Sequence, residues 1–237
     1  MSHYLSRLRL APNPTTEALK SLLDPDQRGA AMDAHHRLLW TAFAANAPID
    51  KTISPFLWRS EGKGVFYVLS KSKPDQALLF QPPEVKVFSP VLATGDTLQF
   101  VLRVNATKTR PTKHLTEEKG AWRDRRVDIV MHELFNVPRG KERQERRLQI
   151  AQQVGHAWLR EQGQKSGFTI QECVVEDYSV EALPIHRGPR DRQRQFGILD
   201  LKGSLTVTDP IAFMEKLLRG FGRAKAFGCG LMMIRRA

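Results

Sequence analysis

The protein has 237 residues, 41% hydrophobic and 26% charged, a composition typical of one large globular domain or two smaller ones. We find no apolar run long enough for a membrane span and no secretory signal at the N-terminus, so we expect neither. With 37 basic and 25 acidic residues the net charge is +12, which favours a polyanionic partner, nucleic acid above all.

The first part of the chain alternates between strand and helix patterns. Leu8 and Leu10 alternate with arginines as in a half-buried strand, and Met32, Leu39 and Phe43 recur at helical spacing. In chain order we predict a strand (3–10), a helix (28–45), a hairpin of two strands (53–60 and 64–71), a short helix (74–80) and a strand (84–88).

The second part repeats this series. Asp209, Pro210 and Gly220 mark the N-cap, first turn and C-cap of one helix. The predicted elements are a strand (96–109), a helix (145–163), two strands (168–183 and 196–207), a helix (209–220) and a strand (231–236). We assign no function to the charge-dense stretch 110–147.

Both parts therefore follow the order β-α-β-β-α-β. This order predicts an α+β protein made of two tandem ferredoxin-like (RRM-like) domains, with boundaries at 1–90 and 96–237. The two cysteines, Cys173 and Cys229, form neither a CxxC pair nor a disulfide framework, so a reducing cytoplasm is the expected location.

Two stretches combine cations with turn-forming residues. The connector PIHRGPRDRQRQF (184–196) lies between two predicted strands, which makes it an arginine-rich hairpin tip suited to phosphates and guanine edges. Its four arginines are Arg187, Arg190, Arg192 and Arg194. Arg103 and Lys108 add positive charge near the end of strand 96–109, although that signal is weak alone.

The second stretch is GFGRAKAFGCG (220–230), which has neither the Walker A spacing nor the dinucleotide fingerprint. Glycine allows a backbone to approach a ligand closely and to point N–H groups at phosphates, so the interleaved cations favour a polyphosphate backbone. The alternative is a flexible linker. The residues concerned are Gly222, Arg223, Lys225, Gly228 and Gly230.

His35 and His36 stand side by side in the predicted helix 28–45. Adjacent helical residues point about 100° apart, so this pair makes no metal site by itself, and MHEL (131–134) lacks the second histidine of a zinc motif. We therefore expect no metal and no cofactor. Both histidines flank the apolar stripe, so a purely structural role is the alternative to catalysis for each.

Three stretches together resemble the CasE family, the repeat-processing endoribonucleases of type I-E CRISPR systems. They are HHRLLWTAF (35–43), LRVNATKT (102–109) and GFGRAKAFGCGLMMI (220–234), and the resemblance spans the whole chain. Its most specific element is the glycine-rich stretch, in which Arg223 stands where members commonly have proline. The region from about 120 to 147 looks longer than in other members.

The resemblance implies metal-independent cleavage of CRISPR precursor RNA at the 3′ base of the repeat stem-loop, by attack of a 2′-OH. It implies retention of the product hairpin and assembly into the Cascade complex. It places the catalytic histidine at His36, and Asp33 is close enough in the helix to orient the imidazole or raise its pKa. The expected RNA ligands are the cations and glycines named above, together with Arg37.

A non-catalytic RNA-binding protein with tandem RRM-like domains is the alternative. An RRM carries aromatic signatures on its central strands, and GVFYVL (64–69), the nearest stretch, does not match them.

Overall fold

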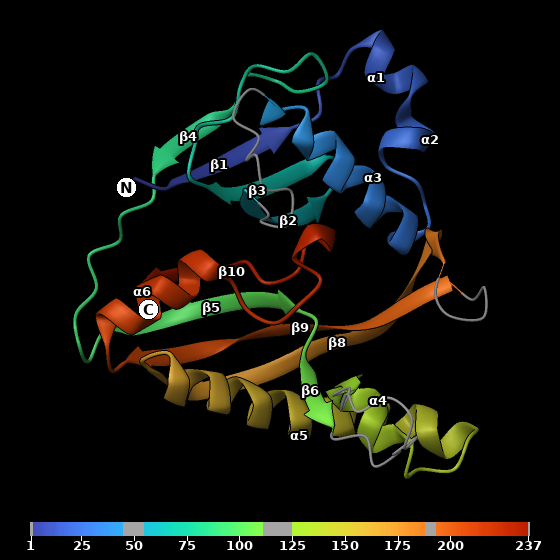
Figure 1. The fold of residues 1–237 in the computed structure, drawn as a ribbon, viewed down its shortest axis with the longest axis vertical. Helices are drawn as coiled ribbons and strands as arrows, with labels where there is room; N and C mark the ends of the chain where they lie inside the picture. The colour runs from blue at the N-terminus through green and yellow to red at the C-terminus, as the bar shows by residue number, and fades with distance from the viewer. Residues whose placement is uncertain (1, 45–54, 111–124, 188–192, 237) are drawn as a thin grey trace, which may run out of the picture.

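The computed structural model describes residues 2–44, 55–110, 125–187 and 193–236. Two four-stranded antiparallel sheets, one from each half of the chain, make up its centre (Figure 1). In the described ranges, no helix is long and apolar enough to cross a membrane.

The N-terminal sheet has the strand order β2-β3-β1-β4. Its elements are β1 (Tyr4–Arg9), α1 (Pro14–Ala18), α2 (Lys20–Leu23), α3 (Arg28–Trp40), β2 (Phe56–Gly62), β3 (Val65–Ser70) and β4 (Glu84–Val87). Helix α3 covers one face, where Leu38 and Leu39 share a buried cluster with Leu8, Phe66 and Val68. The burial of Leu8 between the half-buried Arg7 and Arg9 agrees with the predicted alternation of the first strand.

The hairpin β2–β3 also confirms its prediction. Lys63 and Gly64 form its turn with positive φ angles of 51° and 68°, the conformation that tight hairpin turns require. The predicted helix 74–80 is wrong. This segment is a loop in which Phe80 is 3% exposed and pairs with Leu10, whereas Leu78 is 82% exposed.

The C-terminal sheet has the order β10-β5-β9-β8. Its elements are β5 (Thr97–Val104), α5 (Lys141–Lys165), β8 (Phe168–Arg187), β9 (Gln193–Val207), α6 (Pro210–Arg219) and β10 (Met232–Arg236). As in the N-terminal sheet, the first and third strands of the unit are central and the other two are edges. The prediction of two tandem ferredoxin-like folds is confirmed. The domain boundaries at 1–90 and 96–237 stay a prediction.

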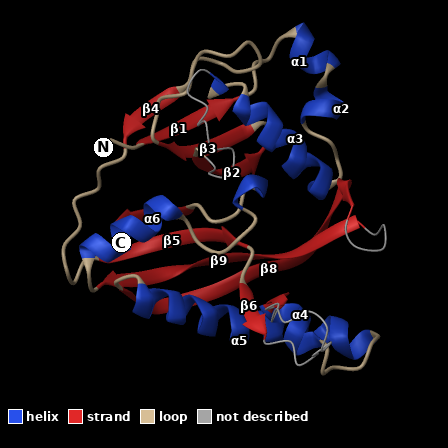
Figure 2. Cartoon of the chain, in the orientation of Figure 1, coloured by secondary structure: helices blue, strands red, loops and turns tan. Residues whose placement is uncertain are grey.

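A small insertion separates β5 from α5 (Figure 2). It contains β6 (Thr107–Arg110), β7 (Arg125–Asp128) and α4 (Ile129–Leu134), and β6 pairs with β7. The predicted single strand 96–109 is therefore two strands in different sheets. The chain turns at Asn105, whose side chain donates to the Gly197 carbonyl at 2.7 Å.

The two halves meet through the face of the N-terminal sheet opposite α3. Leu57 and Leu69 on that face pack with Leu231, and Leu218 of α6 and Met233 of β10 complete the contact. This packing brings the glycine-rich stretch 220–230, with its short 3-10 helix η3 (Lys225–Phe227), against the N-terminal half.

Candidate active site

The two adjacent histidines of α3 have different surroundings. His35 is 6% exposed, its Nε2 lies 2.9 Å from Asp24 Oδ1, and its ring packs edge-on against Phe66 with 4.8 Å between ring centroids. Burial lowers the pKa of His35, and the Asp24 carboxylate offsets part of that effect. These contacts give His35 a structural role in the N-terminal core.

His36 is only partly buried and points to the junction of the two halves. Its ring centroid lies 6.1 Å from that of Phe56 in β2 and 6.4 Å from that of Phe227 in η3. Trp40, one helical turn further on, donates from Nε1 to His36 Nε2 at 3.1 Å. Since an indole N–H can only donate, His36 Nε2 is unprotonated in this arrangement and the neutral ring carries its proton on Nδ1.

The pKa of His36 is lower than that of a free histidine. Burial is the larger cause, and the nearby Asp33 carboxylate acts in the opposite direction. The expectation that Asp33 raises the pKa of His36 is correct in sign for this interaction, and burial outweighs it. Asp33 is itself 3.1 Å from the guanidinium of Arg37, which shares its attraction.

The glycine-rich stretch is packed against its neighbours. The N–H of Gly230 donates to the Arg103 carbonyl at 2.7 Å, and the N–H of Gly228 donates to Lys225. A Cβ added to Gly228 would lie 3.1 Å from the Trp58 ring, and one added to Gly222 would lie 2.5 Å from the Asn105 carbonyl oxygen. Gly228 and Gly230 are thus buried, and their N–H groups donate to backbone carbonyls, so both allow close packing; RNA binding by these glycines stays a prediction.

The cations of this stretch are placed differently from its glycines. Arg223 is exposed, and its backbone N–H donates to the Asn105 carbonyl. Lys225 is partly buried and donates to the carbonyl of Arg219 at 2.7 Å. Burial, followed by the repulsion of Arg219, lowers the pKa of Lys225. Arg223 and Lys225 thus belong to the same loop as Phe227, whose ring lies near that of His36.

Strands β8 and β9 extend beyond the sheet as a long ribbon towards α3 (Figure 1). Of the four predicted arginines, Arg187 and Arg194 lie in its paired backbone, whereas Arg190 and Arg192 lie outside the described residues. Arg28, the first residue of α3, holds this ribbon.

The guanidinium of Arg28 lies 3.4 Å from Asp177, 3.6 Å from Glu181 and 3.3 Å from Asp200. At Gly29 a Cβ would lie 1.9 Å from the Ala182 carbonyl oxygen, so helix and ribbon are in direct contact.

Three other predicted RNA ligands are engaged with carboxylates. Arg103 makes two hydrogen bonds to Asp200, at 2.8 and 3.1 Å, with a side chain only 20% exposed. Lys108 pairs with Glu133 at 3.0 Å on the insertion. Arg37 is 64% exposed beside Asp33. The structure brings Arg37 into the neighbourhood of His36 and leaves Lys108 on the separate sheet of β6 and β7.

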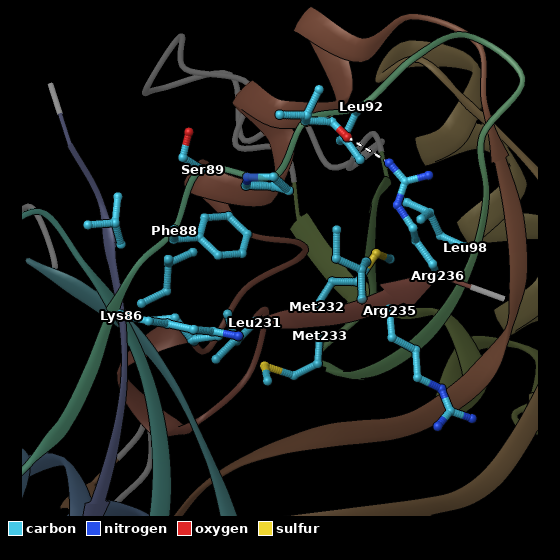
Figure 3. Close-up of a pocket in the computed structure, with 16 residues that line it drawn as sticks. Lys86, Phe88, Ser89, Leu92, Leu98, Leu231, Met232, Met233, Arg235 and Arg236 are labelled. Atoms are coloured by element: carbon cyan, nitrogen blue, oxygen red, sulfur yellow. Dashed lines mark hydrogen bonds between the residues drawn. The ribbon is translucent and has the colours of Figure 1, made fainter.

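A cleft of about 480 Å³ lies on the face of the N-terminal sheet away from α3. Figure 3 shows Lys86 and Phe88 on one side and Met233 and Arg235 on the other. Arg236 donates to the Val91 carbonyl at 3.1 Å and fastens the connection between the halves. Within the part of the chain that the structure describes, no group of three or more His, Cys, Asp or Glu side chains could hold a metal ion.

The family model described as "CRISPR associated protein" matches residues 3–236. The chain belongs to this family. The CRISPR-associated endoribonuclease Cse3 of Thermus thermophilus is 27% identical over 242 residues, covering 91% of this chain and 97% of that relative. The resemblance to the CasE family is confirmed by these matches.

Two solved structures share the fold of this family member. The CRISPR endoribonuclease Cse3 bound to a 19-nucleotide RNA is 22% identical with a TM-score of 0.63, covering 99% of this chain and 100% of that one. Cas6e from Escherichia coli K-12 is 21% identical with the same TM-score and the same coverage.

Sequence reasoning missed two side chains around His36. Helical spacing places Trp40 beside His36, because residues four apart on a helix share a face. Phe56 and Phe227 come from β2 and η3, and only the packing of the two halves brings their rings to the histidine.

Proposed function

We propose that this protein is a metal-independent endoribonuclease that cleaves CRISPR precursor RNA at the 3′ base of the repeat stem-loop. One observation carries the proposal: a partly exposed, neutral histidine, His36, stands at the junction of two ferredoxin-like halves, facing a loop with cations. Family membership over nearly the whole chain supports the same activity.

His36 acts as the general base in this mechanism. The neutral ring offers a lone pair at Nε2, which takes the proton of the 2′-OH when the RNA hydroxyl replaces the N–H of Trp40. The 2′-oxygen then bonds to phosphorus, the bond from phosphorus to the 5′-oxygen breaks, and the imidazolium or water returns a proton to that oxygen. The products are a 2′,3′-cyclic phosphate, which can open to a 3′-phosphate, and a 5′-hydroxyl.

The rest of the rate enhancement comes from position and charge. General acid–base catalysis contributes about 10²–10⁴-fold, so the RNA must also be held for in-line attack. Arg223 and Lys225 belong to the glycine-rich stretch that reaches His36 through Phe227, and we assign to them the stabilisation of negative charge on the phosphorane. Asp33 and Trp40 position and tune the imidazole without touching the substrate.

The β8–β9 ribbon binds the stem in our proposal. The major groove of A-form RNA is deep and narrow, so a thin ribbon bearing Arg187, Arg190, Arg192 and Arg194 enters it best at the end of the stem. Arg37 can join the RNA surface through its exposed side chain. RNA binding by Arg103 and Lys108 stays a prediction, since each would exchange a carboxylate for a phosphate.

The partners follow from the same assignment. The protein retains the hairpin product and enters the Cascade complex as a subunit, in the cytoplasm where precursor RNA is made. The non-catalytic alternative has less support, because a relative that aligns over nearly its full length is named an endoribonuclease.

The test is incubation of a labelled repeat hairpin with the protein in EDTA. We expect one cut at the 3′ base of the stem, with cyclic or 3′-phosphate and 5′-hydroxyl ends. A requirement for Mg²⁺, or a 5′-phosphate end, would indicate a metal-dependent hydrolysis and contradict the mechanism. A gel shift without cleavage would favour the RNA-binding alternative.

A further inference from the structure

A cleft of about 760 Å³ is lined in part by Phe56, whose ring also packs near His36. Both halves of the protein form it: Phe56 and Lys71 come from the N-terminal sheet and its continuation, Arg219 ends α6, and Arg223 and Lys225 belong to the glycine-rich stretch. We call it the loop cleft. Its volume falls within the roughly 300–1,000 Å³ of typical ligand sites.

The loop cleft is strongly positive. Lys71, Arg219, Arg223 and Lys225 line it, against a single carboxylate, Glu215. In the described part of the chain, no carboxylate forms an ion pair with Lys71, Arg219 or Arg223. Burial and the nearby Arg219 lower the pKa of Lys225, so these cations repel one another in a partly desolvated site. A polyanion would relieve that repulsion.

The shape of the loop cleft suits a single strand of RNA. Pro55, Leu218, Ala224 and Ala226 contribute partly exposed apolar surface between the cations. Riboses and bases can lie on such a surface while phosphates meet the cations, which is the general pattern of single-strand binding.

The loop cleft shares Phe56 with the surroundings of His36. Arg28 holds the ribbon at the start of α3, and His36 lies eight residues later, about 12 Å along the helix axis. Phe56 and Phe227 contact His36, and Phe56 also lines the loop cleft. An RNA that follows this line meets the ribbon as a stem, passes His36 and enters the loop cleft as an unpaired strand.

We propose that the loop cleft binds the single-stranded RNA immediately 3′ of the cleaved phosphate, holding that phosphate in line for attack. This inference rests on the proposed function, because it presupposes cleavage at the 3′ base of a stem. Lys71 and Arg219 act as substrate-binding residues for the segment that leaves after the reaction, so replacing these two affects the precursor and leaves binding of the product hairpin unchanged.

The test compares affinities for three RNAs: the repeat hairpin alone, the hairpin with a 3′ tail and the hairpin with a 5′ tail. A 2′-deoxyribose before the scissile phosphate removes the nucleophile and prevents cleavage. We expect the wild-type protein to bind the 3′-tailed RNA about tenfold more tightly than the bare hairpin at moderate salt. The double variant Lys71→Glu, Arg219→Glu should lose this gain and bind the bare hairpin as before.

Two controls keep the result interpretable. Arg139→Glu with Arg160→Glu makes the same change in net charge at exposed positions outside the loop cleft, and should preserve the gain from the tail. Lys71→Arg with Arg219→Lys keeps the charge within it and should also preserve the gain. Thermal melting confirms that each variant is folded.

The inference is overturned if the reversal weakens all three RNAs equally, if it weakens none, or if only the 5′-tailed RNA is affected. Failure of the proposed function shows separately, as absence of cleavage when the wild-type protein meets the all-ribose 3′-tailed RNA.

Discussion

The two halves share an order of strands and differ in what they attach to it. In the N-terminal half the first crossover is α3, which presents His36, and the second crossover is a loop that ends at Phe80. In the C-terminal half the hairpin is a long ribbon and the second crossover is α6 followed by the glycine-rich stretch. The N-terminal half thus supplies the histidine, and the C-terminal half supplies most of the cationic surface.

Of the variants that test this division between the two halves, His36→Ala should have the largest effect. Cleavage of the repeat hairpin should fall by about 10²–10⁴-fold under single-turnover conditions, because the proton acceptor is removed. Hairpin affinity should stay within a few-fold, since binding resides mainly in the C-terminal half.

His35→Ala is the matched control for that variant. Its effect on cleavage should be much smaller, although it removes the buried contact with Asp24 and lowers stability. If His35→Ala abolishes cleavage while His36→Ala does not, the assignment of the two histidines is reversed. If both folded variants cleave normally, the N-terminal half does not supply the chemistry.

The converse test reverses the charge of Arg187, Arg190, Arg192 and Arg194 to Glu. Hairpin affinity should drop by about 10²-fold or more at low salt, and the slope of log K against log salt should decrease by roughly 0.7–0.9 for each phosphate that the protein no longer neutralises. Lysine at the same positions keeps the charge and should retain most of the salt dependence. Unchanged affinity in the glutamate variant would remove the ribbon from the RNA interface.

Asp200→Asn sharpens the comparison at the point where the halves meet. Asp200 accepts both hydrogen bonds from the mostly buried Arg103 and pairs with Arg28 of α3. Leaving Arg103 without its carboxylate should reduce the free energy of unfolding by about 3 kcal/mol, measured by denaturant titration. Asp177→Asn removes a more exposed partner of Arg28 and should cost less than about 1 kcal/mol. Equal reductions would mean that burial of this network is unimportant.

Trp40→Phe removes the donor to His36 Nε2 and keeps an aromatic ring. The donor stabilises the neutral imidazole, so its removal should raise the pKa of His36 and move the acidic limb of the pH–rate profile to higher pH. At neutral pH the rate should fall by less than about tenfold. A profile that keeps its midpoint would show that the indole only packs.

Asp33→Asn should have the smallest effect and the opposite sign. Asp33 raises the pKa of His36 by attraction, and its replacement also leaves the charge of Arg37 unopposed nearby. The limb of the profile that belongs to His36 should therefore move to lower pH. A shift to higher pH would contradict the electrostatic role of Asp33.

Most of the fold follows from local patterns in the sequence. The caps of α6 are an example: Asp209 accepts from Ile211 and Ala212, and Gly220 ends the helix with a φ of 79°, as the residue types predict. The helix predicted over 74–80 is wrong because the apolar residues of this segment are compatible with a loop as well as with a helix. The prediction of one strand over 96–109 fails at Asn105, because residues typical of strands stand on both sides of it. The turn there is fixed by contacts with the Gly197 carbonyl and the glycine-rich stretch.

The candidate site was only partly predictable for a related reason. The position of His36 came from a resemblance, and helical spacing leads to Trp40. The loop cleft could not be predicted, because Lys71 and Arg219 belong to different halves and become neighbours only through the packing of Leu57 and Leu69 on Leu231.

Strand β10 completes the C-terminal sheet by pairing with β5, Met232 opposite Leu102, across most of that half of the sequence. Closing so long a loop costs chain entropy before the pairing repays it, which makes this step late in folding. The glycine-rich stretch leads directly into β10 and is anchored on Asn105 at the end of β5, so it reaches His36 only when the sheet is closed. A chain still being synthesised or refolded can form α3 without the loop that faces it, and ribonuclease activity therefore begins with the completed fold.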